Sequence, residues 1–402
     1  MEAERLRVAI QIERFWPNRG GAEAYARTLA SGLADEGHAV TVFALEGAEP
    51  PPKVTLTLVA APHRPHWLRT LLYARRTDAL CAPGGFDIVH AMGKSLGMNI
   101  LNPHGGVEEV WLERQARSYP AGPKRLLWMA GRYLTPRHWV LRSIFRRQYR
   151  DPRVLRFVAL SRASAEAMTR VHGVDPSRIR VLANSVDPSR FRPAASDEER
   201  RALRLRLGIP DDAVVLLFVG HNFRLKGLYC LMSALAATGE RGTPLRVEVL
   251  GRGDIESARR TARACGVEGR MSFRGGVSTI EEWYRAADGY VHPTFFDTAS
   301  LSLLEAMASG LPVIASRHDG SSEQLAFPRG GVLLDEPGDV PVFARALERM
   351  LERAWRVQAG AANRELAERV HRRDPVRAML AIYRKALSER CSPPVAQDSG
   401  PR

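Results

Sequence analysis

Residues 292–316 read HPTFFDTASLSLLEAMASGLPVIAS and hold a strand, a helix and a second strand in close succession. Pro293 ends the first apolar strand, a turn follows, and Ser300 stands where a helix running to about Ser309 needs an N-cap. The apolar PVIAS that follows is typical of a strand buried on both faces of a parallel sheet. The stretch therefore predicts an α/β fold with a doubly wound sheet.

Asp297 and Glu305 are two carboxylates, eight positions apart, in this otherwise apolar stretch. Asp297 lies in the turn, and Glu305 lies about one and a half turns into the helix, beside Leu301 and Leu304. A buried carboxylate needs hydrogen-bond donors, and sugar hydroxyls supply them. One acid could therefore bind the ribose of a nucleotide and the other a transferred hexose, with phosphates near the free amides at the helix start. The alternative is that Asp297 only favours the helix dipole while Glu305 pairs with an internal arginine.

The same alternation of strands and helices extends in both directions from this stretch. Beyond a polar, proline-bearing linker near residue 187, it predicts strands at 213–220, 245–251, 271–276, 289–293 and 312–316. Upstream, it predicts strands at 6–12, 38–45, 54–60, 86–92, 154–160 and 178–187. We therefore expect two Rossmann-like domains, 1–186 and 187–372, facing across a cleft, and a disordered tail at 391–402.

Composition limits the class of protein further. At 402 residues the chain is too long for one compact core, and 45% hydrophobic with 26% charged residues is typical of a globular protein. No apolar run could span a bilayer, no signal-peptide pattern is present, and the four cysteines form no CxxC pair, so we expect a cytoplasmic protein without a zinc site. The net charge of +15 favours anionic partners, namely nucleotide phosphates, anionic lipid or nucleic acid.

Loops at the carboxyl ends of parallel strands are where ligands bind in such folds. Gly20 and Gly21 let backbone amides approach an anion at a helix N-terminus, but the full GxGxxG fingerprint is absent, which disfavours an oxidoreductase. Arg224 and Lys226 suit a diphosphate leaving group, without the spacing of a Walker loop. Gly275 lies in a loop whose backbone could hold the edge of a base. Each of these loops is also compatible with a plain turn.

Residues 108–156 interrupt the alternation, with arginines interleaved among apolar residues and almost no acids after Glu113. One interpretation is a basic amphipathic insertion that lies on an anionic membrane or grips an anionic acceptor. The other is a set of helices that pack by their apolar sides and leave a solvated basic face. The sequence favours neither.

Taken together, these segments resemble the retaining glycosyltransferases of family four, which have the GT-B fold. The resemblance covers nearly the whole chain and rests on RGGAE at 19–23, VLANSVDPSRF at 181–191, VGHNFRLKG at 219–227 and DTASLSLLEAMASGLPVIAS at 297–316. Asp297 replaces the usual glutamate, and Thr298, Ala299 and Ser300 replace the usual Gly-Phe-Gly, a departure that bears on contacts to the donor sugar. The PHGG at 103–106 is most similar to the subgroup containing lipopolysaccharide core glucosyltransferases.

The resemblance implies a role for each matching residue. Glu305 would bind the donor ribose, and Asp297 would hold the donor sugar and stabilise its developing positive charge. Arg224 and Lys226 would neutralise the diphosphate, and His104 of the PHGG stretch would face the transferred sugar. The substrate-binding set is completed by Gly20, Gly21, Ser300, Leu301 and Gly275. A last helix, 373–390, would cross back to the N-terminal domain.

A specific function follows from the resemblance. We expect a retaining hexosyltransferase that moves a hexose from a nucleotide sugar, UDP-glucose or similar, to a lipid-linked or cell-surface glycan, in the cytoplasm or at the inner face of the membrane. No metal or other cofactor is expected. The alternatives are a sugar-nucleotide epimerase or hydrolase on the same scaffold, a non-catalytic nucleotide-sugar-binding protein, and a nucleic-acid-binding protein, for which no recognisable motif is present.

Overall fold

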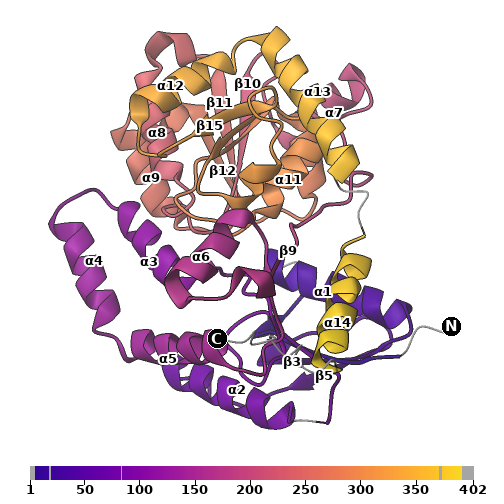
Figure 1. Cartoon of the computed structure of the whole chain (residues 1–402). Helices are drawn as coiled ribbons and strands as arrows, with labels where there is room; N and C mark the ends of the chain where they lie inside the picture. Colours follow the sequence, from indigo (N-terminus) through magenta and orange to yellow (C-terminus); the bar gives the residue numbers. More distant parts are fainter. Residues whose placement is uncertain (1–4, 18–19, 83, 371–373, 392–402) are drawn as a thin grey trace, which may run out of the picture.

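The computed structural model describes residues 5–17, 20–82, 84–370 and 374–391, and its chain forms two α/β lobes stacked one above the other (Figure 1). Each lobe is built on a parallel sheet, so the two facing Rossmann-like lobes predicted from the sequence are confirmed. The predicted disordered tail lies outside the described residues apart from Cys391, which ends a helix.

The N-terminal lobe contains a seven-stranded sheet in the order β5-β3-β1-β6-β7-β8-β9. Apolar runs form these strands because both faces of the sheet are covered by helices. The strands are β1 Arg7–Gln11, β3 Ala39–Ala44, β5 Val54–Leu58, β6 Ile88–Ala91, β7 Ile100–Leu101, β8 Arg156–Ala159 and β9 Ile179–Val181. The covering helices include α1 Gly21–Asp35, α2 His66–Leu80 and α6 Arg162–His172, and a short pair, β2 Arg14–Phe15 and β4 Glu46–Gly47, lies apart from the sheet.

The C-terminal lobe contains a six-stranded sheet in the order β12-β11-β10-β13-β14-β15. Its strands are β10 Val214–Val219, β11 Leu245–Leu250, β12 Met271–Gly275, β13 Gly289–His292, β14 Val313–Ser316 and β15 Gly331–Leu334. Its helices are α7 Asp197–Leu207, α8 Leu228–Ala237, α9 Ile255–Ala264, α10 Ile280–Ala286, α11 Leu301–Ala308, α12 Val340–Arg349 and α13 Arg353–Val370. The quoted stretch 292–316 thus forms the end of β13, helix α11 and strand β14, as the sequence predicts.

The insertion 108–156 forms three helices between β7 and β8. They are α3 Glu108–Arg117, α4 Pro123–Tyr133 and α5 Pro136–Arg150. Helix α5 packs on α2, while α4 projects from the side of the N-terminal lobe (Figure 1). No helix among the described residues is both long and apolar enough to cross a membrane.

The last helix, α14 Pro375–Cys391, returns from the C-terminal lobe and lies beside α1 (Figure 1). Gly32 of α1 leaves room for it, because a Cβ there would lie 2.5 Å from a methyl group of Val376. Tyr383 is fully buried, and its hydroxyl lies 2.5 Å from Nδ1 of His90 at the centre of the N-terminal sheet. The chain therefore crosses between the lobes twice, which restricts how far they can separate.

Candidate functional site

The turn that carries Asp297 is fixed by the topology of the C-terminal sheet. Strands β13 and β14 are parallel neighbours, so the segments that follow them leave the sheet side by side. The backbone N–H of Asp297 donates to the carbonyl of His318 at 2.9 Å, and Gly320 N–H donates to the carbonyl of Asp297 at 3.0 Å. The two loops therefore form one rigid unit at the carboxyl edge of the sheet.

Asp297 stands in a cluster of charged and titratable side chains. Its carboxylate forms an ion pair with Lys226, and the two side chains keep 22% and 18% exposure to solvent. His292 Nε2 lies 3.8 Å from Asp297 Oδ2 and 3.6 Å from Asp319 Oδ2, while Tyr290 holds the other ring nitrogen of His292 at 3.1 Å. Burial acts to raise the pKa of Asp297, but the charge and hydrogen bonds of Lys226 and His292 together outweigh it, and the pKa lies below its ordinary value. Asp297 is therefore ionised at neutral pH.

Asp319 is the buried partner of this turn. Its carboxylate accepts hydrogen bonds from the backbone N–H groups of Ser300 at 3.2 Å and Ser321 at 2.9 Å, and from the Ser300 hydroxyl. Burial, together with the nearby Asp297 charge, raises the pKa of Asp319. Ser300 occupies the N-cap position of α11, as predicted. Its hydroxyl donates to Asp319 instead of accepting a hydrogen bond from the helix, so the predicted side-chain cap is not formed.

Two helix N-termini from opposite lobes meet beside this turn. Neither α1 nor α11 has a side-chain cap, so the first backbone N–H groups of both helices carry no such partner. A Cβ on Gly21 would lie 3.3 Å from Cδ1 of Leu301, which shows how closely the two helix starts approach. Each contributes partial positive charge to the shared space. The arrangement suits an anion held between the lobes.

Glu305 lies in the second turn of α11 and is half-buried. Tyr284 donates a hydrogen bond to Glu305 Oε2 at 2.8 Å. Burial raises the pKa of Glu305 to about 7, against the lowering effect of this hydrogen bond. Among the described residues no ion pair to Glu305 is present, so the alternative in which it pairs with an internal arginine is not seen in the structure.

The side chains of Arg224 and Lys226, two positions apart in the sequence, point to different partners. Lys226 turns toward Asp297, whereas the Arg224 guanidinium lies 4.6 Å from the ring centres of both Tyr119 and Tyr229. Tyr119 follows α3 of the N-terminal lobe, so this stacking joins the lobes across the cleft. A contact of Arg224 with a diphosphate stays a prediction.

The PHGG loop of the N-terminal lobe lies against the acidic turn. A Cβ on Gly106 would lie only 2.8 Å from Cζ of Phe296, next to Asp297, and Gly106 has a φ of 74° that favours glycine. His104 packs against Tyr25 with 4.5 Å between ring centres. Burial lowers the pKa of His104 to about 3, so the imidazole is neutral at physiological pH and can exchange a hydrogen bond with a hydroxyl.

Gly275 lies farther along the same sheet edge. Its carbonyl accepts a hydrogen bond from Gly251 N–H at 2.7 Å, and Gly220 N–H binds the carbonyl of Leu250 at 3.0 Å. Glycines thus stand at the ends of three adjacent strands and leave a floor of bare backbone. The structure records no contact between Gly275 and the Asp297 cluster, as expected for β12, which lies two strands away from β10.

A cavity of about 450 Å³ opens between the lobes and reaches Asp297. It is lined from the N-terminal lobe by Val107, Val110, Glu113, Arg114, Ser161, Ala163, Ser164, Glu166, Ala167 and Arg170, and from the C-terminal lobe by Phe296, Asp297, Arg317, His318 and Gly320. Glu323 closes one side by accepting hydrogen bonds from the first two amides of α6, both at 2.9 Å. Asp297 therefore lines a space that both lobes build.

Sequence reasoning missed His292, Asp319 and Tyr284 as members of the site. A signal was present for Asp319, because it follows the strand next to β13 and the ends of neighbouring parallel strands meet. His292 belongs to the quoted stretch, but the last residue of a buried strand is usually structural. Nothing in the sequence indicates that Tyr284, on α10, reaches Glu305.

Comparison with known proteins identifies the family of this chain. Residues 19–190 match the family model for glycosyltransferase family 4, and residues 213–353 match the model for glycosyl transferases group 1. The chain is also 30% identical to the D-inositol 3-phosphate glycosyltransferase of Geodermatophilus obscurus over 408 aligned positions, which cover 92% of this chain and 86% of that protein. This chain belongs to glycosyltransferase family 4.

Solved structures of other glycosyltransferases share the fold. WaaG, a glycosyltransferase involved in lipopolysaccharide biosynthesis, superposes with a TM-score of 0.79 at 21% identity, over 96% of this chain and 100% of that one. HepE of Anabaena, in complex with UDP-glucose, gives a TM-score of 0.70 at 17% identity, over 96% and 100% of the two chains. These matches confirm the GT-B fold. Two curated relatives match over shorter stretches, so that the chain spans about half of their length, 49% and 57%.

Proposed function

We propose that this glycosyltransferase moves a hexose from a UDP-sugar to a hydroxyl group of an acceptor, with retention at the anomeric carbon. The observation that carries the proposal is the position of Asp297 and Lys226, at the point where the uncapped starts of α1 and α11 face each other across the cleft. In this arrangement a cation and two sets of free amides are available for a diphosphate, and a carboxylate is available for the sugar.

The donor would lie across the carboxyl edge of the C-terminal sheet. The glycine floor at the ends of β10 to β12 accommodates a flat base, and Glu305 accepts hydrogen bonds from the ribose hydroxyls. Lys226 and the helix starts bind the diphosphate, so the sugar would reach Asp297 beside the 450 Å³ cavity. The structural neighbour HepE was crystallised with UDP-glucose, which supports a UDP-sugar as the first donor to try.

The proposed reaction requires the site to stabilise two opposite charges. As the bond between sugar and phosphate breaks, negative charge grows on the leaving diphosphate and positive charge grows on the sugar ring. The fixed N–H groups and Lys226 stabilise the first, and the ionised Asp297 stabilises the second. The leaving phosphate would accept the acceptor proton, as the resemblance to the family implies, so no separate side-chain base is required.

We propose that this reaction proceeds without a metal ion. His292, Asp297 and Asp319 offer ligand atoms within 4.8 Å of one another, a spacing that a metal could use. The Lys226 ammonium already bonds the Asp297 oxygen that faces this group, and a cation there would have to displace it. Transfer activity should therefore be unchanged after treatment with EDTA, and loss that Mg²⁺ or Mn²⁺ restores would contradict this part of the proposal.

The names of the related proteins suggest two classes of acceptor. The curated relative from Geodermatophilus obscurus is named a D-inositol 3-phosphate glycosyltransferase, while WaaG is involved in lipopolysaccharide biosynthesis. Arg114, Arg170 and Arg317 line the cavity beside Asp297, which suits an acceptor with a phosphate group. We propose an acceptor that carries an anionic group near its reacting hydroxyl, either a phosphorylated cyclitol or a phosphorylated, lipid-linked glycan.

Thermal shift with a panel of nucleotide sugars tests the donor first, because a ligand that binds only the folded state raises the melting temperature. Transfer to each acceptor class, with the anomeric configuration read by NMR, then tests the reaction. Asp297→Asn should abolish transfer and retain donor binding, whereas Glu305→Ala should weaken donor binding as well. Full transfer by Asp297→Asn would refute its role, and acceptor-free conversion of the donor to an epimer or free sugar would favour the epimerase or hydrolase alternative.

A further inference from the structure

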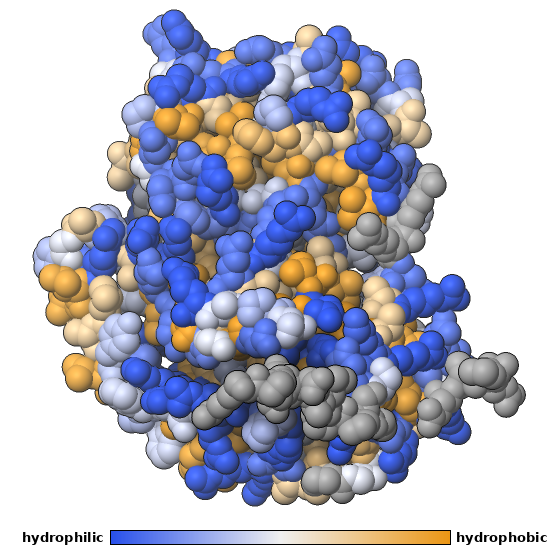
Figure 2. All heavy atoms as spheres, viewed as in Figure 1, coloured by the Kyte–Doolittle hydropathy of each residue, from blue (hydrophilic) through white to orange (hydrophobic). Residues whose placement is uncertain are grey.

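Helix α4 turns its apolar side to solvent. Leu126, Leu127 and Leu134 are 66%, 71% and 82% exposed, and Tyr133 is 42% exposed. At 100° per residue these side chains share one arc of the helix, and none of the residues of α4 is buried. A surface helix normally packs its apolar side against the core and turns its polar side to solvent. Figure 2 shows hydrophobic residues on the projecting edge of the molecule, where Figure 1 places α4.

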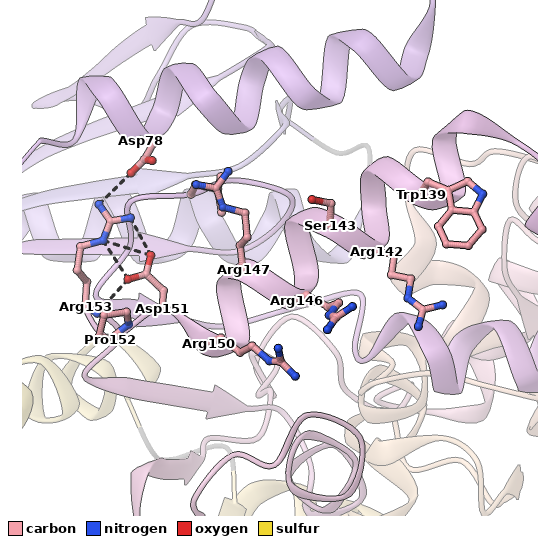
Figure 3. A pocket seen from close by; sticks show the side chains of 11 residues that line it. Asp78, Trp139, Arg142, Ser143, Arg146, Arg147, Arg150, Asp151, Pro152 and Arg153 are labelled. Atoms are coloured by element: carbon pink, nitrogen blue, oxygen red, sulfur yellow. Dashed lines mark hydrogen bonds and ion pairs between the residues drawn. The ribbon is translucent and has the colours of Figure 1, made fainter.

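Helix α5, which follows α4 after a two-residue connection, carries a stripe of arginines. Its inward face is formed by His138, Leu141, Ile144, Gln148 and Tyr149, which are all buried. Its outward face carries Arg142, Arg146, Arg147 and Arg150, all exposed, and begins with Trp139, which is 58% exposed. Figure 3 shows Arg142, Arg146 and Arg150 extending from the same side of the helix.

These arginines lack the counter-charges that other arginines of the chain possess. Arg153, nearby, is paired with Asp78 at 2.9 Å and Asp151 at 2.7 Å (Figure 3). Within the described ranges, no carboxylate lies within ion-pair distance of Arg142, Arg146 or Arg150. The stripe borders an open basin of about 990 Å³, and none of the residues that line this basin lines the cavity beside Asp297. Unpaired cations around a concavity suit phosphate groups.

Helix α4 is held in place by contacts with neighbouring segments. Arg132 of α4 pairs with Glu108 of α3 at 3.3 Å and lies over the ring of Trp111 at 5.2 Å. Trp128 of α4 stacks with Tyr119 at 5.5 Å between ring centres, and Tyr119 in turn contacts Arg224 of the other lobe. The exposed side of α4 is therefore fixed in orientation, and its apolar residues cannot fold back onto the protein.

We propose that the α4–α5 surface binds an anionic lipid bilayer. The leucines of α4 insert between the lipids, Trp139 lies at the boundary with the headgroups, and the arginines of α5 contact lipid phosphates. This proposal concerns a surface outside the cleft and does not depend on the sugar-transfer proposal.

Co-sedimentation with vesicles tests the proposal directly. The protein should bind vesicles of phosphatidylcholine with phosphatidylglycerol and bind pure phosphatidylcholine far more weakly. R142E/R146E/R150E should lower partitioning by at least about 100-fold, since the loss of each positive charge near an anionic surface costs about fivefold and the new glutamates add repulsion. The matched control R260E/R345E/R353E changes the net charge equally on exposed positions of the other lobe and should bind almost as the wild type does.

The apolar face is tested separately. L126S/L127S/L134S should also reduce binding, whereas L205S, at an 85% exposed leucine of α7, should not. All substituted side chains are exposed, so melting temperatures should match the wild type and exclude misfolding as a cause. Equal loss in the two charge-reversal variants, or wild-type binding by the leucine variant, would overturn the proposal. Binding of soluble glycerol phosphate at the arginine stripe without vesicle binding would contradict a membrane as the occupant.

Discussion

Replacement of Glu305 by glutamine should make the protein more stable, by an amount that increases as pH rises from about 4.5 to about 7. Burial raises the pKa of Glu305 to about 7, from an ordinary value of 4.5. A carboxyl whose pKa is raised on folding destabilises the folded state as pH climbs from the unfolded value through the folded one. The difference corresponds to about 3 kcal/mol at pH 8 and to less than about 1 kcal/mol at pH 5. Glutamine keeps an acceptor for the Tyr284 hydroxyl but carries no charge.

Melting temperatures of wild type and Glu305→Gln at pH 5 and pH 8 give the measurement. For a lobe of this size, 1 kcal/mol shifts the melting temperature by about 2–4 °C, so the gap between the two proteins should widen by roughly 6 °C or more from pH 5 to pH 8. The lobes can unfold separately, so the transition of the C-terminal lobe is the one to follow. A gap that stays constant with pH would refute the reasoning that the site keeps a buried, destabilising charge.

Donor binding should then be linked to proton release at the same residue. Ribose hydroxyls donate to the ionised carboxylate and favour it over the protonated form, so affinity should increase as pH rises through about 7. Calorimetry in buffers of different ionisation enthalpy should detect a released proton near pH 6.5 for the wild type and none for Glu305→Gln. An affinity independent of pH in both proteins would contradict a ribose contact by Glu305.

Three further substitutions test the geometry of the cleft. Asp297→Asn should lower transfer by at least about 100-fold while UDP affinity is kept or increased, because Lys226 is released toward the diphosphate, and equilibrium binding beside a transfer assay checks this. Gly106→Val places a side chain 2.8 Å from the Phe296 ring at a positive φ, so it should hold the lobes apart, reduce transfer and increase the radius of gyration in small-angle scattering. Glu323→Gln should weaken the two charge-assisted hydrogen bonds that Glu323 accepts from the start of α6 by about 1 kcal/mol. The first amides of α6 should then exchange hydrogen faster. Unchanged exchange would show that this contact does not hold the lobes together.

Local signals account for the part of the fold that the sequence predicted well. The polar Ser161 after an apolar strand predicts a helix at 162–172, and α6 is found at Arg162–His172, where Ser161 caps it and Gly173 ends it in the left-handed conformation. Both signals lie within one turn of the helix that they bound. The strands were predicted for a similar reason, because burial on both faces of a parallel sheet requires an apolar run. The two-residue strand β7 was not predicted, because so short a strand has no pattern of its own.

The site was predicted less completely, because its side chains depend on contacts between distant segments. Arg224 and Lys226 stand two positions apart, and their charge alone predicts the same ligand for both. Only the folded chain shows that Tyr119, from the insertion in the other lobe, draws Arg224 away from the carboxylate that Lys226 contacts. In the same way, the pKa of Glu305 depends on how deeply α11 is packed, which a helical pattern does not give.

The pairing of Lys226 with Asp297 explains how the empty cleft can keep a carboxylate ready for a positively charged sugar. Without donor, the ammonium neutralises Asp297 and keeps it ionised in spite of burial and of the nearby Asp319. A diphosphate in the space between α1 and α11 competes for the same ammonium. As Lys226 turns to the phosphates, Asp297 loses its counter-ion inside a cleft that screens charge poorly, and its attraction for positive charge on the sugar increases. The lysine would thus stabilise the leaving group and, by the same movement, expose the carboxylate that stabilises the sugar. The proposed reaction therefore requires no large rearrangement of the acidic turn, which its backbone hydrogen bonds to the loop after β14 hold in place.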